Sequence, residues 1–597
     1  MVITTKGEQL LIFDLETDGL LPEVSVIHTI TTYETERNLY ATYDKKDVKH
    51  GITQILNASE ICGHNIINYD IPVIKKLVGL EPKGTIRDTM VLARLAYPEI
   101  KELDFALLKL GKLPGKLIGR HSLEAWGWRI GEYKGTKIED WSQWTQDMSD
   151  YCKQDVNVTQ LLWRRCMQKG LPEEAIVLEH QVQTIIQRQT EFGFAFDKDK
   201  AEKFYSILLK KQKELSAKLR EFFPPWTTEE VFIPKRDNKT RGYKANVPFV
   251  KVKTIEFNPA SRAHIANRLT TLYGWKPIEW TDDGSPKLDE DTIKELNYPE
   301  APYLAEYFLI TKRIGQLAEG TEAWLKNVGS DGRMHGSVNT IGAVTRRMTH
   351  SHPNMAQVPR VGTEYGADCR GLFYSPAGTE LVGADASGLE LRCLAHYMAA
   401  YDKGAYVQEL LKGDIHTVNQ RLAGLPDRDT AKTFIYAFLY GAGDFKIGTI
   451  IGKGTAQGKA IKNKFLEGLP ALASLKSVVE SVAQEKGVLR SLDGAPIKVR
   501  SQHAALNTLL QGAGAIVMKK ALVCTDQALQ ESGLIPGKDY EFVANIHDEW
   551  QIECKKGLGV TCGELSVKGI IKAGELLNLR CPLNGEFKVG HTWAETH

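Results

Sequence analysis

The chain has 597 residues, which corresponds to roughly four domain-sized units at about 150 residues each. Its composition, 42% hydrophobic and 25% charged, is typical of a soluble globular protein, and no apolar run approaches the roughly 18 residues of a membrane span. The formal net charge of +2 excludes nucleic-acid binding through a global excess of positive charge, so any such surface must be a local patch.

The cysteines and the N-terminus indicate the compartment. Nine cysteines, an odd number without a CxxC pair, favour thiols in a reducing cytoplasm over disulfides or a zinc site. The N-terminus lacks a basic segment followed by an apolar core, so we expect no signal peptide.

The first region, up to about residue 170, has alternating strand-like and helical segments, as in an α/β domain. Residues 8–13 read as a buried strand that leads directly into Asp14. Asp14 and Glu16 lie two apart on this strand and therefore face the same way. Tyr151 and Asp155 lie four apart on a helix and share one face. Asp70 follows a further apolar segment.

Four carboxylates converging on one site would repel each other unless they bind cations. Two Mg²⁺ ions roughly 3.5–4 Å apart could activate a water molecule for phosphodiester hydrolysis, with Tyr151 orienting that water. Each acid alone is better explained as a cap, turn or surface charge, and only the ordered set favours catalysis. Asp88 is also acidic, and we assign it a structural role.

The middle of the chain predicts a long helical stretch from Glu173 to about Glu221, followed by an irregular, basic segment over residues 222–253. From Lys235 to Lys253 there are seven lysines and arginines against one acid, Asp237. Helical patterning resumes near Ser261 and again over residues 301–328. No internal repeat is found.

The last region, from about residue 331, contains two acidic motifs, LVGADASGLELR and NIHDEWQIE. Asp385 ends an apolar run, and Asp548 lies at the tip of an expected hairpin, so the two carboxylates could share a pair of metal ions across an antiparallel sheet. Glu549 is adjacent to Asp548 and points the opposite way on a strand, so we rank it lower.

Between these motifs, RDTAKTFIYAFLYGAG predicts a helix on which Arg428, Lys432 and Tyr436 share one face. The two cations repel each other by about 0.2–0.5 kcal/mol on an isolated helix. A bound triphosphate would offset this repulsion, and the tyrosine ring could lie under the incoming base or sugar. The alternative is that this helix face is simply a solvated basic surface without a ligand.

The ordered strings DGRMHGSVNTIGAVT, ADASGLELRCLAH, GDIHT, AKTFIYAFLYGAG, HAALNTLLQ and HDE resemble DNA polymerases of the DNA polymerase I type, family A, and within it the replicative enzymes of T-seven-type podophages. Residues 8–165 resemble proofreading 3′–5′ exonucleases of the DEDD type, tyrosine subclass. The resemblance implies an α/β multidomain fold with a ribonuclease H-like exonuclease domain (1–170), a thumb (171–330, with a short basic insertion near 224–253), a palm in two parts (331–401 and 501–597) and fingers (402–500).

The same resemblance implies further roles for individual residues. Asp385 and Asp548, helped by the Ala386 carbonyl, would hold the polymerase metals, and Arg428, Lys432 and His416 would bind the triphosphate. Tyr436 would stack near the sugar, and Glu390 would exclude ribonucleotides. The contacts to the primer–template near its 3′ end would come from Arg347, Asn507, Gln511 and His547.

The cofactor and partners also follow from the resemblance. It implies two Mg²⁺ ions per active site, with Mn²⁺ as a substitute. It also implies a monomeric enzyme that acts on primer–template DNA and dNTPs in the cytoplasm of a bacterial host. Helicase–primase and single-strand binding protein are candidate partners. In the phage family a long basic thumb insertion recruits thioredoxin; here that segment is short, which puts thioredoxin in doubt and makes duplex backbone the alternative contact.

Two other interpretations compete with this one. A single-subunit RNA polymerase shares the palm and fingers, but the N-terminal acids and Glu390 argue against it. A degenerate polymerase acting as a DNA-binding subunit would have lost carboxylates, and all six are present.

Overall fold

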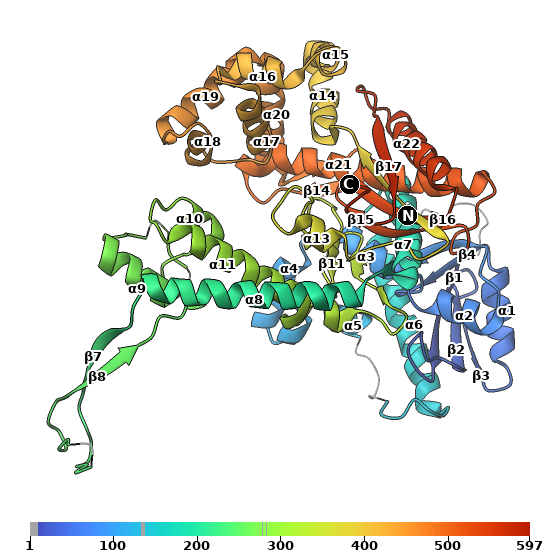
Figure 1. Ribbon diagram of the computed structural model, residues 1–597. Coiled ribbons are helices and arrows are strands. Elements are labelled where there is room, and N and C mark those ends of the chain that lie inside the picture. The colour runs from blue at the N-terminus through green and yellow to red at the C-terminus, as the bar shows by residue number, and fades with distance from the viewer. Residues whose placement is uncertain (1–9, 133–137, 241, 278, 282) are drawn as a thin grey trace. The chain divides into compact units, whose positions relative to one another are not determined.

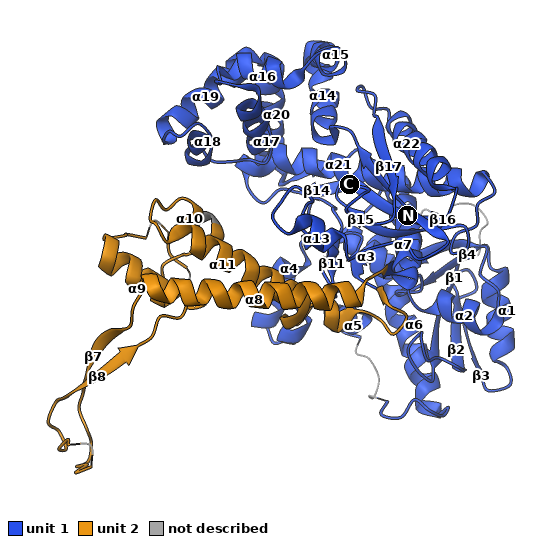
Figure 2. Cartoon of the chain, in the orientation of Figure 1, with its two compact units in different colours: residues 1–194, 335–597 blue, residues 195–334 orange. Residues whose placement is uncertain are grey.

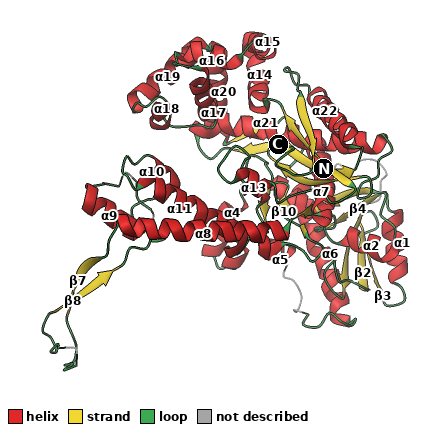
Figure 3. Cartoon of the chain, in the orientation of Figure 1, coloured by secondary structure: helices red, strands yellow, loops and turns green. Residues whose placement is uncertain are grey.

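The computed structural model describes residues 10–132, 138–240, 242–277, 279–281 and 283–597 (Figure 1). The chain divides into two compact units, one made of residues 1–194 and 335–597 and the other of residues 195–334 (Figure 2). In the larger unit the long strands gather into two sheets, whereas the smaller unit is mostly helical (Figure 3). Among the described helices, none combines the length and the apolar character needed to cross a bilayer.

The first sheet of the larger unit has five strands in the order β3-β2-β1-β4-β5. β1 is antiparallel to β2 and parallel to β4, and β5 is parallel to β4. The bounds are β1 Leu10–Thr17, β2 Ile27–Glu34, β3 Leu39–Asp44, β4 Glu60–Gly63 and β5 Thr85–Asp88. The helices are α1 Val48–Asn57, α2 Asp70–Val78, α3 Thr89–Ala96, α4 Ile100–Lys109, α5 Leu123–Ile130 and α6 Gln146–Met167.

The two faces of β1 pack against different helices, because successive side chains of a strand point to opposite sides. Leu11, Phe13 and Leu15 join a buried cluster with residues of α1 and α2. Leu10 and Ile12 join a second cluster that includes Val156 of α6. The even-numbered face of β1 is therefore the one that looks toward α6.

The helical stretch expected from residue 173 to about 221 is two helices, α7 (Glu173–Phe192) and α8 (Lys198–Phe222). The interruption is at Gly193, whose φ of 70° lies in the region that favours glycine and ends α7. The short strand β6 (Phe194–Ala195) follows. α7 belongs to the larger unit and packs against α3, α21 and β15.

The smaller unit contains α8 packed against α11 (Ala301–Ile314), with α9 (Arg262–Tyr273), α10 (Glu290–Lys294) and α12 (Trp324–Asn327). The segment expected to be irregular is a two-stranded antiparallel ribbon instead, with β7 at Trp226–Phe232 and β8 at Phe249–Ile255. β8 alternates valine with lysine over residues 250–253, whereas β7 (WTTEEVF) lacks a regular alternation, and most side chains of both strands are exposed. Lys235, Arg236, Lys239 and Lys244 lie in the loop that joins the two strands.

The second sheet of the larger unit is antiparallel, in the order β15-β16-β12-β17. Its strands are β12 Thr379–Ala386, β15 Tyr540–Ile546, β16 Glu549–Lys555 and β17 Gly585–Gly590. The long helix α21 (Ala505–Glu531) packs against α22 (Gly559–Leu576), which covers β12 and β17. Asp548 lies in the turn between β15 and β16, as the sequence predicted.

A helical group follows β12 and shares the largest buried core with α21 and the second sheet. It comprises α14 Leu389–Asp402, α15 Ala405–Lys412, α16 Ile415–Ala423, α17 Arg428–Leu439, α18 Asp444–Ile450, α19 Thr455–Gly468 and α20 Pro470–Lys486. The shorter elements are β9 Arg333–Met334, β10 Ser337–Asn339, β11 Thr349–Ser351, α13 Gly366–Arg370, β13 Val488–Arg490 and β14 Pro496–Lys498. All nine cysteines of the chain are buried.

A buried ionic cluster ties α7 to α21, to the segment before β11 and to the turn between β13 and β14. The Glu179 carboxylate lies 2.7 Å from the Lys519 ammonium and 2.5 Å from the Arg346 guanidinium. Arg346 also lies 2.7 Å from Asp493. All four side chains are less than a tenth exposed, and their two positive and two negative charges balance. Removing one partner would leave a buried charge uncompensated, which costs far more than the intact cluster contributes.

The close packing of α22 on α21 depends on Gly569. A methyl group added there would lie 2.2 Å from Thr525 Oγ1 and 2.8 Å from its backbone nitrogen, so the helices would have to separate. We expect Gly569→Ala to lower the free energy of unfolding by about 1–3 kcal/mol, measured by urea denaturation. Gly514→Ala on α21 is the control, because its methyl would meet Leu389 at an ordinary 3.5 Å. Equal stability of the two variants would contradict this account.

Two candidate acidic sites

The two acids of the second sheet are brought together by strand pairing. Asp385 lies opposite Glu549 in the β12–β16 ladder, and the Ala386 N–H donates to the carbonyl oxygen of Asp548 at 3.0 Å. The turn that carries Asp548 therefore lies directly against the end of β12. Asp548 follows His547, whose φ of 60° turns the chain sharply. The sequence predicted this juxtaposition from the two apolar runs.

The electrostatics of this pair favour a bound cation. Burial, and then the neighbouring Asp548 and Glu549, raise the pKa of Asp385 to about 7. Burial, and then Glu390, raise the pKa of Asp548. Clustered carboxylates of this kind regain their ionised forms when a divalent ion neutralises them, and oxygen ligands suit Mg²⁺. The donor set therefore fits the metal that the sequence implied.

Glu549 belongs to a different set of contacts. Its Oε1 accepts hydrogen bonds from Trp593 Nε1 and Gln551 Nε2, each at 2.7 Å, and its Oε2 lies 2.6 Å from His597 Nδ1. Arg370 lies 3.5 Å from the same carboxylate. Glu549 thus anchors the start of β16 to the end of the chain.

The helix α17 presents the face that its spacing predicted. Its buried side is apolar, with Ala431, Phe434, Ile435 and Phe438, whereas Lys432 is exposed and Tyr436 is half-buried. Arg428 donates from Nε to Asp414 at 2.5 Å. His416 lies on α16 beside Tyr436, with ring centroids 6.3 Å apart, and burial followed by Arg428 lowers the pKa of His416.

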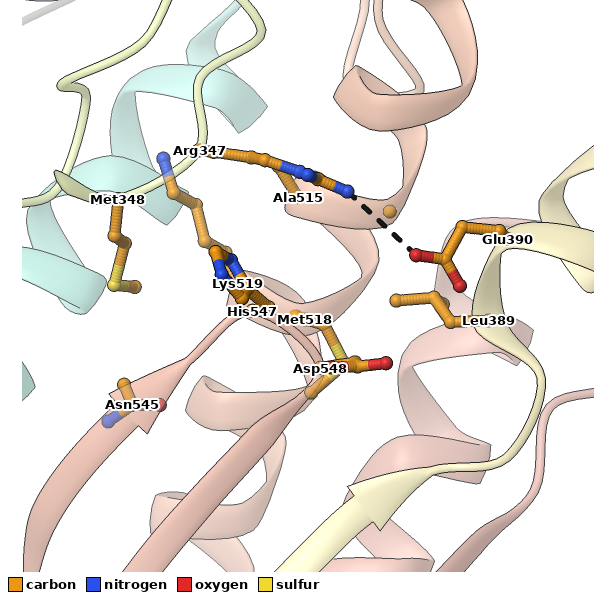
Figure 4. Close-up of a pocket in the computed structure, with 11 residues that line it drawn as sticks. Arg347, Met348, Leu389, Glu390, Ala515, Met518, Lys519, Asn545, His547 and Asp548 are labelled. Atoms are coloured by element: carbon orange, nitrogen blue, oxygen red, sulfur yellow. Dashed lines mark ion pairs between the residues drawn. The ribbon is translucent and has the colours of Figure 1, made fainter. Parts of the chain in front are cut away.

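A pocket of about 40 Å³ lies beside Asp548 (Figure 4). Arg347, Glu390 and His547 line it, together with Met348, Leu389, Gly514, Ala515, Met518, Lys519 and Asn545. Arg347 lies 3.9 Å from Glu390. Burial, and then Arg347, lower the pKa of His547, so its imidazole is neutral at pH 7. The structure thus gathers Arg347, Glu390 and His547 around one acid, Asp548.

Asn507 and Gln511 lie elsewhere on the helix that borders this pocket. They are one turn apart on α21, and Gln511 Nε2 donates to Asn507 Oδ1 at 2.8 Å. Neither side chain lines the pocket, whose α21 residues lie further along the helix.

Tyr440 is a neighbour of this site that the sequence analysis missed. Its hydroxyl donates to Glu390 Oε1 at 2.9 Å, joining the end of α17 to the start of α14. The available signal was its position four residues after Tyr436, which places it on the same helix face.

The N-terminal acids gather where β1, α2 and α6 meet. Asp14 and Glu16 continue the face of β1 that looks toward α6, the helix that carries Tyr151 and Asp155. Carboxylate oxygens of Asp14 and Glu16 and the Cys152 sulfur lie within 4.8 Å of one another. Cys152 donates to the Asp14 carbonyl at 3.3 Å, and burial raises the pKa of its thiol well above the usual range. A neutral thiol is no ligand for Mg²⁺, which leaves the two carboxylates.

Asp70, the first residue of α2, lies against the same strand. Its carboxylate accepts a hydrogen bond from the backbone of Leu15, between Asp14 and Glu16. Burial is the main cause that raises the pKa of Asp70 to about 7, and Asp88 and Asp155 add to it. Its buried Oδ1 has no hydrogen-bond donor among the described residues, so this oxygen is available to a cation.

Asp88 organises the loop that leads to Asp70. Its carboxylate accepts hydrogen bonds from the backbone N–H groups of Asn65, Ile67 and Met90, at 2.9–3.1 Å. These contacts are consistent with the structural role assigned from the sequence.

A family model described as DNA polymerase family A matches residues 238–595, more than half of the chain. The DNA-directed DNA polymerases of Enterobacteria phage T3 and Escherichia phage T7 are each 37% identical to the chain, over 98% of its length and 100% of theirs. The chain therefore belongs to DNA polymerase family A. Both alignments run over 705 residues, so more than 100 positions have no counterpart in this chain of 597.

More distant relatives share part of the chain. DNA polymerase I of Pseudomonas aeruginosa is 27% identical over 57% of the chain and 39% of the relative. Among solved structures, the POL domain of Pol1 from M. smegmatis, in complex with DNA primer-template and dNTP, superposes with a TM-score of 0.75 at 17% identity, covering 98% of this chain and 96% of that one. This likeness shows the shared fold.

The raised pKa of Asp385 has a consequence for stability. Because this pKa is 3.8 for an ordinary aspartate and about 7 in the folded protein, ionisation disfavours folding. The penalty is absent below pH 3.8, grows as pH rises and is complete above about 7. In EDTA we therefore expect Asp385→Asn to raise the melting temperature by about 1–2 °C at pH 8, since solvent screens this exposed carboxylate, and by less at pH 5.

Differential scanning fluorimetry at the two pH values measures this effect. Asp429→Asn is the control, because this carboxylate lies 4.0 Å from the Arg428 guanidinium in the first turn of α17, so its replacement should not raise the melting temperature at either pH. A stabilisation by Asp385→Asn that is the same at pH 5 and pH 8 would show that ionisation is not its cause.

Proposed function

We propose that the chain is a template-directed DNA polymerase that carries a 3′–5′ proofreading exonuclease in its N-terminal region. The observation that supports the polymerase assignment is the register of β12 and β16, because it brings Asp385 and Asp548 close together at one end of the second sheet. The N-terminal acids at the junction of β1, α2 and α6 carry the exonuclease.

For the polymerase reaction, the proposed metal ligands are the carboxylates of Asp385 and Asp548 and the carbonyl of Ala386. Two Mg²⁺ ions, or Mn²⁺ as a substitute, would supply activation of the primer 3′-hydroxyl and neutralisation of charge at the reacting phosphate. Arg428 and Lys432 would bind the triphosphate, with His416 next to it. The ion pair with Asp414 would hold the Arg428 guanidinium in place in the absence of nucleotide. The more highly charged triphosphate would then replace Asp414 as the partner of Arg428.

We assign binding of the incoming nucleotide's sugar and of the primer 3′ end to the pocket beside Asp548. Tyr436 would stack near the incoming sugar, and Glu390, held by the Tyr440 hydroxyl, would occupy the space under the 2′ position and exclude ribonucleotides. Arg347 and His547 line the pocket and Asn507 and Gln511 lie on the adjoining helix, from where they would contact the primer–template near its 3′ end.

For the exonuclease, Asp14, Glu16, Asp70 and Asp155 are the proposed metal ligands, and Tyr151 would orient the attacking water. The sheet order β3-β2-β1-β4-β5, with an antiparallel meander followed by two parallel strands, supports a ribonuclease H-like fold for residues 1–170. The buried Oδ1 of Asp70, which has no hydrogen-bond donor among the described residues, supports a cation at this site.

The domain assignment is likewise a proposal. The second sheet would be the palm (331–401 and 501–597), the helical group that includes α17 the fingers (402–500), and the segment 171–330 the thumb. The smaller compact unit, residues 195–334, supports a separate thumb, whereas α7 belongs to the larger unit.

The proposed partners are primer–template DNA and dNTPs, as in the complex of the M. smegmatis relative. The phage relatives support action on phage DNA in a bacterial cell, with helicase–primase and single-strand binding protein as further candidates. The ribbon of β7 and β8 offers two short strands and a basic tip in place of a long insertion, so we propose that it contacts duplex backbone and not thioredoxin.

The two acidic sites make separable predictions. Asp548→Ala should reduce primer extension with dNTPs by at least about 100-fold and leave degradation of single-stranded DNA intact. The double variant Asp14→Ala, Glu16→Ala should do the reverse on a mismatched primer. Gel assays of both activities on both proteins decide the matter. Loss of both activities in either protein would mean that the division of labour is wrong, and extension with NTPs in preference to dNTPs would favour an RNA polymerase.

The ribbon makes a prediction about salt. Replacing Lys235, Arg236, Lys239 and Lys244 with alanine should make the log–log dependence of DNA affinity on salt shallower, by about 0.9 for each phosphate that the ribbon no longer neutralises. Fluorescence anisotropy on primer–template at several salt concentrations measures the slope. Arg241, which belongs to the same basic run, lies outside the described residues.

The matched control removes four exposed lysines from the N-terminal region, Lys49, Lys83, Lys101 and Lys109. This variant has the same net charge as the ribbon variant and should keep the wild-type slope. An unchanged slope in the ribbon variant would remove the DNA-contact proposal, and a gain in processivity on adding thioredoxin would point to a protein partner instead.

A further inference from the structure

Helix α7 lies in the larger unit between the two sheets and contacts elements of both, among them β5 and β15 (Figure 1). Its buried residues include four polar ones, Glu179, His180, Gln183 and Gln189. Buried polar side chains on a helix need partners, and here the partners belong to two different regions of the chain.

One group of contacts reaches the loop between β4 and α2, which ends at Asp70. Gln183 Nε2 donates to Asn68 Oδ1 at 2.8 Å, and Gln187 Nε2 donates to the Asn68 carbonyl at 3.5 Å. Asn68 in turn donates from Nδ2 to Asn65 Oδ1 at 2.7 Å, which closes the loop on itself. Asn68 is only two residues before Asp70, so the position of the loop fixes where the first residue of α2 lies.

A second tie holds the same loop from β5. His180 Nε2 accepts the backbone N–H of Asp88 at 2.7 Å, and the Asp88 carboxylate accepts N–H groups of Asn65 and Ile67. The loop that leads to Asp70 is therefore attached to α7 at two points, one direct and one through Asp88.

The orientation of Gln183 is set from the polymerase region. Thr340 Oγ1 donates to Gln183 Oε1 at 2.9 Å, and both side chains are buried. Because the amide oxygen is engaged by Thr340, the amide nitrogen is the end that faces Asn68. Thr340 lies in the segment that continues to Arg346 and Arg347.

From these contacts we propose that Gln183, oriented by Thr340, is a positioning residue for the exonuclease site, which acts through Asn68 to hold Asp70 against β1. The inference rests on the proposed exonuclease function. It means that the N-terminal site of this chain is completed by side chains outside residues 1–170, one of them from the polymerase region. A misplacement of about 1 Å at a catalytic group can cost about 100-fold in rate, so a single buried amide is sufficient to matter.

The test compares variants on single-stranded DNA and on matched primer–template. Gln183→Leu keeps the size of the side chain and removes both hydrogen bonds. We expect it to lower the exonuclease kcat by about 10-fold or more with KM unchanged, and to leave primer extension at the wild-type rate. Thr184→Val is the matched control, because Thr184 is on the same helix and its hydroxyl donates to the carbonyl of His180, within α7 itself.

Thr340 gives an independent test in case Gln183→Leu disturbs folding. Thr340→Val removes the donor that orients the amide and should lower the exonuclease kcat, and Thr340→Ser should restore it because it restores the hydroxyl. A role in general stability would instead lower the melting temperature and affect both activities in step. Loss of both activities in Thr340→Val would therefore overturn the proposal.

A readout independent of catalysis is Mn²⁺ binding followed by electron paramagnetic resonance without DNA. The background is Asp385→Asn, Asp548→Asn, so that the N-terminal acids dominate the signal. Gln183→Leu should weaken Mn²⁺ binding there by several-fold, as a displaced Asp70 requires, and unchanged binding together with unchanged kcat would overturn the proposal.

These assays distinguish a failure of the exonuclease assignment from a failure of the positioning role of Gln183. If wild-type protein and Asp70→Ala degrade single-stranded DNA equally, the exonuclease assignment itself fails. If Asp70→Ala is inactive while Gln183→Leu and Thr340→Val retain the wild-type kcat, the exonuclease assignment stands and only the positioning role of Gln183 fails.

Discussion

The pairing of β12 with β16 is the constraint on which the proposed polymerase site depends. Asp385 and Asp548 are more than 160 positions apart in the sequence, and the hydrogen bond from Ala386 to the Asp548 carbonyl places them at one end of one sheet. Because strand side chains alternate, a slip of one residue in this register would turn Asp385 to the opposite face of the sheet. The contacts of Glu549 with Trp593, Gln551 and His597 secure the first residue of β16 and so resist that slip.

Helix α7 imposes a comparable constraint on the elements that pack around it in the larger unit. Its ionic cluster with Arg346, Lys519 and Asp493 consists of buried charges that are costly to separate, which holds the helix against α21. Its amides then reach the loop before Asp70. Helix α7 therefore contacts the surroundings of both acidic sites.

Sequence patterns predicted the local features well, because these follow from the periods of helices and strands. The shared face of Asp14 and Glu16, the face of α17 and the turn at Asp548 are all of this kind. Contacts that join distant segments were not predictable in the same way: Tyr440 with Glu390 and Gln183 with Asn68 depend on how elements dock. The division of α7 from α8 at Gly193 had a signal, the glycine itself, which was outweighed by the helical pattern on either side. The β7–β8 ribbon was missed although β8 alternates valine with lysine, because residues 222–253 were interpreted as one basic segment and not strand by strand.

The burial of all nine cysteines has a practical consequence. A thiol reagent can reach a buried sulfur only when the surrounding structure opens, so in the folded protein the rate of labelling reports local opening and not intrinsic thiol reactivity. Cys152 lies beside the N-terminal acids, and Cys554 and Cys562 lie on β16 of the second sheet and on α22, the helix that covers it. Each region thus contains its own chemical reporter, and mass spectrometry of labelled peptides could follow how DNA or nucleotide tightens one region while the other continues to open.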